Sequence, residues 1–319
     1  MTSKKYTVIS LFSGVGGLDL GFHKLGFDII WAIDKNIFAY ISYKKNFPKT
    51  NIILRDIRKI EDQNFPKTAD IVIGGYPCQG FSEAGRQRLD DERNFLYKEF
   101  GRCLKVVQPK LFLAENVPGL KNMSGGRVLE QMIIEFEEKN YNVNYKLLNA
   151  KNFGVPQDRK RLFIVGIRKD LKLNFLFPTP ICGDNLLNYK ILKDTIWDIR
   201  DNPGPFYQGP YTRRYMARQR KRSWNQVSYC IVASADKNPQ HPSGKLMKRI
   251  NHNLFKFVGS NRTLSIKECL LIQTFPENFI LFGPLIEQYR QVGNAVPPLL
   301  AEFLAKAIKK CLEKKNFCS

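Results

Sequence analysis

Residues 8–25 read VISLFSGVGGLDLGFHKL, and this stretch indicates the fold of the chain. It begins with an apolar, β-branched run that is typical of a buried strand, and it ends in apolar residues with helical spacing. The glycines between them let the backbone approach a ligand closely. The stretch therefore predicts a strand, a ligand-binding turn and a helix, which open an α/β domain.

Similar strand-like runs recur along the first half of the chain, with helical stretches between them. We expect strands at residues 8–12, 29–33, 52–54, 71–74, 111–114 and 162–167, and helices at residues 18–25 and 95–107. Continuous apolar strands that alternate with helices are typical of a parallel sheet covered on both faces. The sequence thus predicts a doubly wound, Rossmann-like α/β domain.

Unusual polar residues follow the carboxyl ends of these strands, where open α/β sheets bind their ligands. They are Ser13 and Gly14, Asp34, Asp56, Pro77 and Cys78, and Glu115 and Asn116. Asp34 ends the second strand, where a carboxylate can accept hydrogen bonds from ribose hydroxyls. This pattern favours a ligand that contains adenosine, and a solvated loop acid is the alternative.

The composition and periodicity of the sequence change after Arg168. Residues 178–260 are rich in Pro, Asn, Tyr and Gly and have weak periodicity, which predicts a small, loop-rich domain. Helical spacing returns at residues 298–312. We therefore expect one domain formed by residues 1–177 and 285–319, and a second formed by residues 178–284.

The charge of the chain favours a polyanionic partner. The 319 residues include 51 Lys and Arg against 29 Asp and Glu, a net charge of +22, and residues 212–250 hold ten Lys or Arg and one Asp. Nucleic acid is favoured because each neutralised phosphate releases a counterion, and an anionic membrane surface or a basic proteome is the alternative. With no run apolar enough for a signal peptide or a membrane span, we expect a cytoplasmic, nucleoid-associated protein.

Cys78 is the candidate nucleophile among seven scattered cysteines. A lone cysteine is usually a small buried hydrophobe, but Cys78 follows a strand and Pro77, and Glu115 ends a neighbouring strand. A thiol beside a carboxylate suggests addition to a heterocycle whose ring nitrogen the acid protonates or hydrogen-bonds. The cysteines form no C-x-x-C pair and the three histidines no H-E-x-x-H, so we expect neither a disulfide scaffold nor a metal.

A basic motif, Gln157 to Arg161, precedes the strand at residues 162–167. Alternation along an extended segment puts Arg159 and Arg161 on one side. Two arginines on one side suit phosphate and carbonyl oxygens, and a solvated basic turn is the alternative.

Five motifs together resemble the DNA (cytosine-5) methyltransferases in their order and spacing. They are residues 12–17, 77–79, 115–117, 157–161 and 291–296. Residues 262–276 also resemble the block that follows the family's target-recognition region, so the resemblance covers nearly the whole chain. It implies a prokaryotic restriction-modification enzyme that transfers a methyl group from S-adenosylmethionine to carbon 5 of cytosine in duplex DNA, with residues 178–284 as the recognition domain.

The resemblance also implies roles for individual residues. Cys78 would attack carbon 6 of the cytosine, and Glu115 would hydrogen-bond N3 and the 4-amino group. Arg161 would contact O2 of the base, and Arg159 would support the site. S-adenosylmethionine would be bound by Phe12, Ser13, Gly14, Gly16, Gly17, Asp34, Lys35, Asp56, Ile57, Pro77, Leu96, Asn294 and Ala295. DNA would be bound by Gln79, Ser82, Arg218, Arg220, Arg222 and Lys237.

Three residues depart from the family's pattern. Lys35 stands where many relatives carry a large apolar residue, Tyr76 replaces Phe or Pro, and Cys230 replaces Thr. Within the family, residues 193–198 and 217–224 look most like the subgroup that methylates GGCC, whereas residues 235–244 depart from it.

Three other functions remain as alternatives. The RNA-methylating branch of the fold carries a Cys-Phe-Thr signature that is absent here. A nicotinamide-dependent dehydrogenase would explain the glycines and Asp34 but not Cys78 or Glu115. A catalytically inactive DNA-binding module is disfavoured because every matched catalytic residue is present. We expect a monomer, with any cognate restriction endonuclease acting without direct contact.

Overall fold

A computed structural model describes residues 5–77 and 96–314 of the chain. Contacts divide it into two compact units. Unit 1 comprises Met1–Leu148, Lys160–Thr179 and Ala301–Ser319, and unit 2 comprises Asn149–Arg159 and Pro180–Leu300. Because these units are defined by contacts alone, the functional assignment of residues 178–284 stays a prediction.

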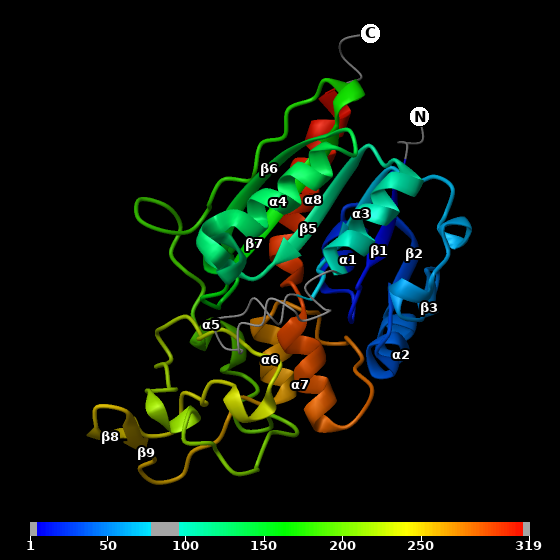
Figure 1. The fold of residues 1–319 in the computed structure, drawn as a ribbon. Helices are drawn as coiled ribbons and strands as arrows, with labels where there is room; N and C mark the ends of the chain where they lie inside the picture. Colours follow the sequence, from blue (N-terminus) through cyan, green and yellow to red (C-terminus); the bar gives the residue numbers. More distant parts are fainter. Residues whose placement is uncertain (1–4, 78–95, 315–319) are drawn as a thin grey trace. The chain divides into compact units, whose positions relative to one another are not determined.

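Unit 1 contains a seven-stranded sheet with the order β3-β2-β1-β4-β5-β7-β6 (Figure 1). Its strands are β1 (Thr7–Leu11), β2 (Asp28–Asp34), β3 (Asn51–Leu54), β4 (Ile71–Gly74), β5 (Leu111–Asn116), β6 (Tyr141–Asn149) and β7 (Lys160–Arg168). The pairs from β3 through β5 are parallel, whereas β7 runs antiparallel to β5. The α/β fold and all six expected strands are therefore confirmed, while β6 was not predicted.

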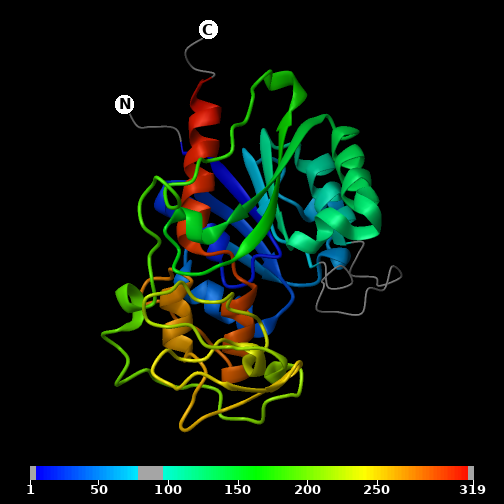
Figure 2. The same ribbon diagram turned by 90° about the vertical axis from the view of Figure 1, so that its left-hand side faces the viewer.

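Helices cover both faces of this sheet. They are α1 (Gly17–Lys24), α2 (Ile37–Asn46), α3 (Leu96–Val107), α4 (Arg127–Glu137) and α8 (Pro298–Glu313). Figure 2 shows the sheet with α8 on one side and α3 and α4 on the other. The Nζ atom of Lys309 on α8 donates to the carbonyl of Leu25 at 3.1 Å, which ties α8 to the end of α1. The helices predicted at residues 18–25, 95–107 and 298–312 are thus confirmed.

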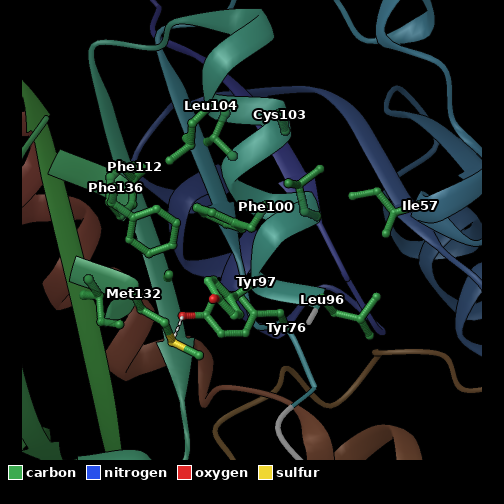
Figure 3. Close-up of a cluster of buried hydrophobic side chains, with 14 of the residues drawn as sticks. Ile57, Tyr76, Leu96, Tyr97, Phe100, Cys103, Leu104, Phe112, Met132 and Phe136 are labelled. Atoms are coloured by element: carbon green, nitrogen blue, oxygen red, sulfur yellow. Dashed lines mark hydrogen bonds between the residues drawn. The ribbon is translucent and has the colours of Figure 1, made fainter. Parts of the chain in front are cut away.

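The core between the sheet and α3 and α4 is rich in aromatic rings (Figure 3). Phe112 on β5 meets Phe100 of α3 and Phe136 of α4 edge to face, with ring centroids 5.8 and 5.0 Å apart. All three side chains are buried, and each contributes about 1.5–3 kcal/mol by leaving water. This core holds the ends of β4 and β5 in fixed positions.

Unit 2 has little regular structure in its described residues, as the loop-rich composition predicted. Its helices are α5 (Lys193–Ile196), α6 (Ile266–Ile272) and α7 (Leu285–Asn294), and its strands β8 (Lys248–Asn251) and β9 (Leu254–Lys256) pair with each other. Ser265 and Glu268 form a capping box at the start of α6. Across the described chain, no helix has the length and apolar character that a membrane crossing requires.

Candidate active site and DNA interface

The order of the sheet reverses between β1 and β4, which is where a doubly wound sheet binds its ligand. The glycine loop follows β1 at this point. Phe12 and Gly14 have positive φ angles of 54° and 55°, and Gly16 has a φ of 85°. β1 therefore ends at Leu11, one residue earlier than the sequence predicted, because the backbone of Phe12 is no longer extended. A Cβ atom at Gly14 would meet no described atom within 4 Å, so the loop is open to a ligand there.

Asp34, at the end of β2, links the glycine loop to the start of the segment that leads into α2. One carboxylate oxygen accepts a hydrogen bond from the amide of Gly14 and the other from the amide of Asn36, each at 2.8 Å. Burial raises the pKa of Asp34, and the backbone hydrogen bonds oppose that rise. The backbone amide of Lys35 is a third donor to this carboxylate. A carboxylate has about four acceptor positions, so three amide donors leave about one position for a ribose hydroxyl.

Asp56 follows β3 and is surrounded by cations. The guanidinium of Arg58 donates to both carboxylate oxygens, at 3.1 and 2.8 Å, and the Nζ atom of Lys35 lies 3.7 Å from one of them. The hydrogen bonds from Arg58 lower the pKa of Asp56 to about 2. Ile57 and Leu96, which were also expected to bind S-adenosylmethionine, are buried in the core of unit 1 (Figure 3).

The segment that leads to Cys78 is held by the core. Tyr76 is 3% exposed, and its hydroxyl approaches the sulfur of Met132 at 3.7 Å (Figure 3). The amide of Asn116 donates to the carbonyl of Tyr76 at 3.4 Å. Pro77 is half-buried and is the last described residue before the motif's cysteine. Cys78, Gln79 and Ser82 lie outside the described residues.

Glu115 and Arg161 form an ion pair at the end of β5. Arg161 Nε lies 2.9 Å from Glu115 Oε1, and the two side chains are only 15% and 12% exposed. A Cβ atom at Gly75 would lie 2.9 Å from Glu115 Oε2, so the carboxylate also faces the segment that leads to Cys78. Unit 1 thus brings together Glu115, Arg161 and the backbone before the cysteine.

Arg159 belongs to unit 2, where its fully buried side chain binds backbone carbonyls. It donates to the carbonyls of Ile231, Gly293 and Ala295 at 2.8–2.9 Å. Asn294, between the last two, is exposed at the end of α7. Arg159 therefore fixes the backbone of the 291–296 motif, and its contribution to catalysis stays a prediction.

The four cations of unit 2 that were expected to bind DNA have different environments. Arg218 and Lys237 are exposed. Arg220 lies over the ring of Tyr215 at 4.8 Å, and Arg222 lies over another tyrosine ring at 4.0 Å. Burial and nearby arginines lower the pKa of Arg220. None of the four forms an ion pair within the described part of the chain, which leaves their charge available to an external anion.

Two buried clusters bring together residues that the sequence analysis did not connect. In unit 2, Glu268 accepts two hydrogen bonds from Arg262 and lies 3.3 Å from His241. Burial lowers the pKa of His241 to about 4. In unit 1, Asp19 and Tyr43 form a fully buried hydrogen bond. Arg262 and Glu268 share the block at residues 262–276, but no sequence motif joins His241 to them, or Asp19 to Tyr43.

The residues present at the switch point fit S-adenosylmethionine. The glycine loop is open beside Gly14, and Asp34 retains acceptor capacity for a ribose hydroxyl. No cluster of three metal-ligating side chains occurs among the residues that the structure describes.

The order of the sheet and the glycine loop at its switch point define a Rossmann-like α/β domain. Residues 6–310 match the C-5 cytosine-specific DNA methylase family, and the chain belongs to this family. It is accordingly a DNA (cytosine-5) methyltransferase.

Similar proteins cover nearly the whole chain. The type II methyltransferase M.FnuDI of Fusobacterium nucleatum is 43% identical over 97% of this chain and 96% of its own. The type II methyltransferase M.NgoPII of Neisseria gonorrhoeae is 40% identical over 96% of each chain. The crystal structure of Spodoptera frugiperda DNMT2, at 22% identity, has the same fold, with a TM-score of 0.66 over 96% of this chain and 100% of that one.

Proposed function

We propose that this enzyme methylates carbon 5 of a flipped-out cytosine in a specific duplex sequence, with Cys78 as its nucleophile. The observation that carries the proposal is the position of Glu115. Its carboxylate is paired with Arg161 and faces Gly75, three residues before Cys78. An acid and a nucleophile that flank one base can activate its ring together.

The chemistry explains why each group is needed. Carbon 5 of cytosine is a poor nucleophile until the thiolate of Cys78 adds to carbon 6, while Glu115 hydrogen-bonds or protonates N3. Addition of the thiolate makes carbon 5 electron-rich, and an electron pair on carbon 5 then forms the bond to the methyl carbon. When bound, S-adenosylmethionine would supply the methyl group as an electrophile, with S-adenosylhomocysteine as the product. A water molecule then removes the carbon 5 proton, and the bond between Cys78 and carbon 6 breaks.

Arg161 would contribute in two ways. Its ion pair with Glu115 holds the carboxylate in one orientation. Its remaining donors suit O2 of the base, which gains negative charge while the thiolate is attached to the ring.

The target carbon cannot be reached inside a stacked duplex, so the base must be flipped out. We assign DNA binding to residues 178–284, and we expect the contacts to include Arg218, Arg220, Arg222 and Lys237. Support comes from the absence of ion pairs at these four cations within the described residues. The tyrosine rings lie against the guanidinium groups of Arg220 and Arg222 and limit their movement, which suits contacts with phosphates and base edges.

The relatives are named type II methyltransferases, which supports a role in a restriction-modification system. Such an enzyme would act on DNA in the cytoplasm, associated with the nucleoid. We propose GGCC as the target, because residues 193–198 and 217–224 look most like that subgroup. A monomer is sufficient for the reaction, and a cognate endonuclease would act on the same sequence without binding this chain.

The test uses S-adenosylmethionine with tritium in its methyl group. Duplex DNA with a single GGCC site, duplex DNA without it, and transfer RNA are incubated with the enzyme, and labelled nucleosides are separated by chromatography. The proposal expects 5-methylcytosine in the first duplex only. Label in transfer RNA or on an exocyclic amine would overturn the proposed reaction. Label at another duplex sequence would overturn the GGCC assignment alone.

A further inference from the structure

Asp19 and Tyr43 form a buried pair beside the glycine loop of unit 1. Asp19 lies in the first turn of α1 and Tyr43 in the last turn of α2, and both side chains are 0% exposed. Tyr43 Oη donates to Asp19 Oδ1 at 2.8 Å. Burial raises the pKa of Asp19 to about 6, although hydrogen bonds from Ser10 and Tyr43 oppose the rise. Burying an ionisable group costs stability, so we expect this pair to have a functional role.

The ring of Tyr43 lies directly against the turn that contains Gly16. Tyr43 stacks on Phe47 with ring centroids 4.5 Å apart. A Cβ atom at Gly16 would lie 2.4 Å from the ring of Phe47 and 2.9 Å from that of Tyr43. Gly16 therefore packs directly on these rings, and their position determines how far the turn can move toward α2.

The glycine loop is thus connected to the β2–α2 segment at two points. The first is Asp34, which accepts hydrogen bonds from the amides of Gly14 and Asn36. The second is the contact of Gly16 with Tyr43 and Phe47, which the hydrogen bond to Asp19 holds in place. Since Asp19 follows the loop by two residues, movement of α2 would be transmitted to both ends of the Gly16 turn.

We propose that Asp19 and Tyr43 are positioning residues for the methyl donor. Their hydrogen bond holds α2 against the Gly16 turn and fixes the loop in the shape that binds S-adenosylmethionine. Both residues act through the loop at Gly16, whereas the loop is open at Gly14. The proposal rests on the assignment of the glycine loop to the methyl donor.

The test measures binding of S-adenosylhomocysteine to the purified full-length enzyme by calorimetry. Tyr43→Phe removes the hydroxyl and keeps the ring against Gly16, and Asp19→Ala removes the acceptor. Each should weaken binding at least about fivefold, because a buried hydrogen bond to a carboxyl group is lost. Asp19→Asn keeps an acceptor for Tyr43 and should bind within about twofold of the wild type. In turnover, Tyr43→Phe should raise the KM for S-adenosylmethionine and leave kcat nearly unchanged.

Tyr141→Phe is the matched control in the same unit. Tyr141 is also 0% exposed, and its hydroxyl donates to the carbonyl of Pro109 at 2.9 Å, just before the amino end of β5. This variant should lose a comparable amount of thermal stability and keep the wild-type affinity for S-adenosylhomocysteine. The difference between Tyr43→Phe and Tyr141→Phe then separates positioning of the loop from general support of the fold.

The outcomes are distinct. Weaker binding in both Tyr43→Phe and Asp19→Ala, with unchanged binding in Tyr141→Phe, supports the proposal. Wild-type affinity in either of the first two variants, or an equal loss in Tyr141→Phe, overturns it. If the wild-type enzyme itself binds no S-adenosylhomocysteine, the assignment of the glycine loop fails instead.

Discussion

Arg161 Nε lies 2.9 Å from Glu115 Oε1, although the two residues are 46 positions apart in the sequence. The reversed direction of β7 explains their contact. Because β7 is antiparallel to β5, its first residues lie beside the carboxyl end of β5, where Asn116 pairs with Leu162. A parallel β7 would have put Arg161 at the opposite edge of the sheet. The antiparallel strand thus delivers a cation to the edge where a parallel sheet binds its ligands.

Replacement of Arg161 tests whether this ion pair serves catalysis. Arg161→Ala should lower kcat about 100-fold, because Glu115 loses its orientation and the base loses a donor in the transition state. The affinity for S-adenosylhomocysteine should remain within about twofold of the wild type. The double variant Arg161→Ala with Glu115→Gln should be scarcely slower than Glu115→Gln alone, since residues that act as a unit are not additive. A decrease of less than about threefold in Arg161→Ala would show that the pair is structural.

Gly75 offers a test that changes no charged residue. In Gly75→Ala, the new Cβ would lie 2.9 Å from Glu115 Oε2 and would displace the carboxylate. We expect single-turnover methylation to slow about tenfold or more, by analogy with other small displacements of catalytic groups. Gly101→Ala on α3 is the control, because its Cβ would lie 3.1 Å from the flexible side chain of Lys139. Equal rates for Gly75→Ala and Gly101→Ala would argue against a role for the Gly75 contact.

The pKa of Asp19 predicts a pH dependence of stability. Its folded-state value of about 6 lies above the ordinary value of 3.8, so the folded protein holds this proton more tightly than the unfolded chain. The related stability is present below about pH 4 and is lost as the pH rises to about 6. The shift corresponds to about 3 kcal/mol, since one pKa unit is about 1.4 kcal/mol. The hydroxyl of Tyr43 does not titrate in this window, because its pKa is raised well above 10.

Asp19→Asn should remove this dependence. Measured by denaturant unfolding from pH 4.5 to 7.5, the free energy of unfolding of the variant should rise relative to that of the wild type as the pH increases. Parallel pH curves for the two proteins would show that Asp19 does not carry the shifted pKa.

The predicted strands were found because buried parallel strands are continuous apolar runs, as at residues 71–74 and 111–114. β6 was missed because it is not a continuous apolar run: residues 142–147 alternate between polar and apolar side chains and are mostly exposed at the edge of the sheet. The direction of β7 could not be predicted either, since an apolar run has the same pattern in both directions. Strand direction depends on how the chain returns to the sheet.

For the site, motifs with a defined place on the sheet were informative. The carboxyl-end rule placed Asp34 beside the glycine loop, and the structure shows its hydrogen bond to Gly14. The alternation of side chains along an extended segment predicted equivalent positions for Arg159 and Arg161. In the structure, Arg159 precedes β7 and binds backbone carbonyls of unit 2, whereas Arg161 lies within β7 and pairs with Glu115. Contacts such as that of Asp19 with Tyr43 depend on tertiary packing, which local sequence patterns do not encode.

Target specificity should follow residues 178–284, because phosphate contacts position a protein on DNA and base contacts specify the sequence. Exchange of this segment with that of a relative that methylates a different sequence should change the target to that of the donor. Bisulfite sequencing of plasmid DNA from cells that express the chimera would identify the methylated sites. An active chimera that kept the original target would refute the assignment of this segment, and the unexchanged enzyme in the same host is the control.

The covalent step can be tested with a duplex that carries 5-fluorocytosine at the target position. If Cys78 adds to carbon 6 and the methyl group to carbon 5, release requires loss of a proton from carbon 5. Fluorine cannot leave as a cation, so the adduct should persist through denaturing electrophoresis. It should form only when S-adenosylmethionine is present, which excludes nonspecific alkylation of a thiol.

Peptide mapping of the trapped complex should place the DNA on Cys78. Cys103 is an unsuitable alternative, because its thiol is buried and burial raises its pKa, which disfavours the thiolate. Cys230 is half-buried and serves as the internal comparison. Cys78→Ser should give no adduct and lose at least about nine-tenths of its turnover, since a serine hydroxyl is far less nucleophilic than a thiolate at neutral pH. Failure to trap the wild-type enzyme, on a sequence that it methylates when cytosine is present, would mean that the methyl group reaches its acceptor directly and that Cys78 is not the nucleophile.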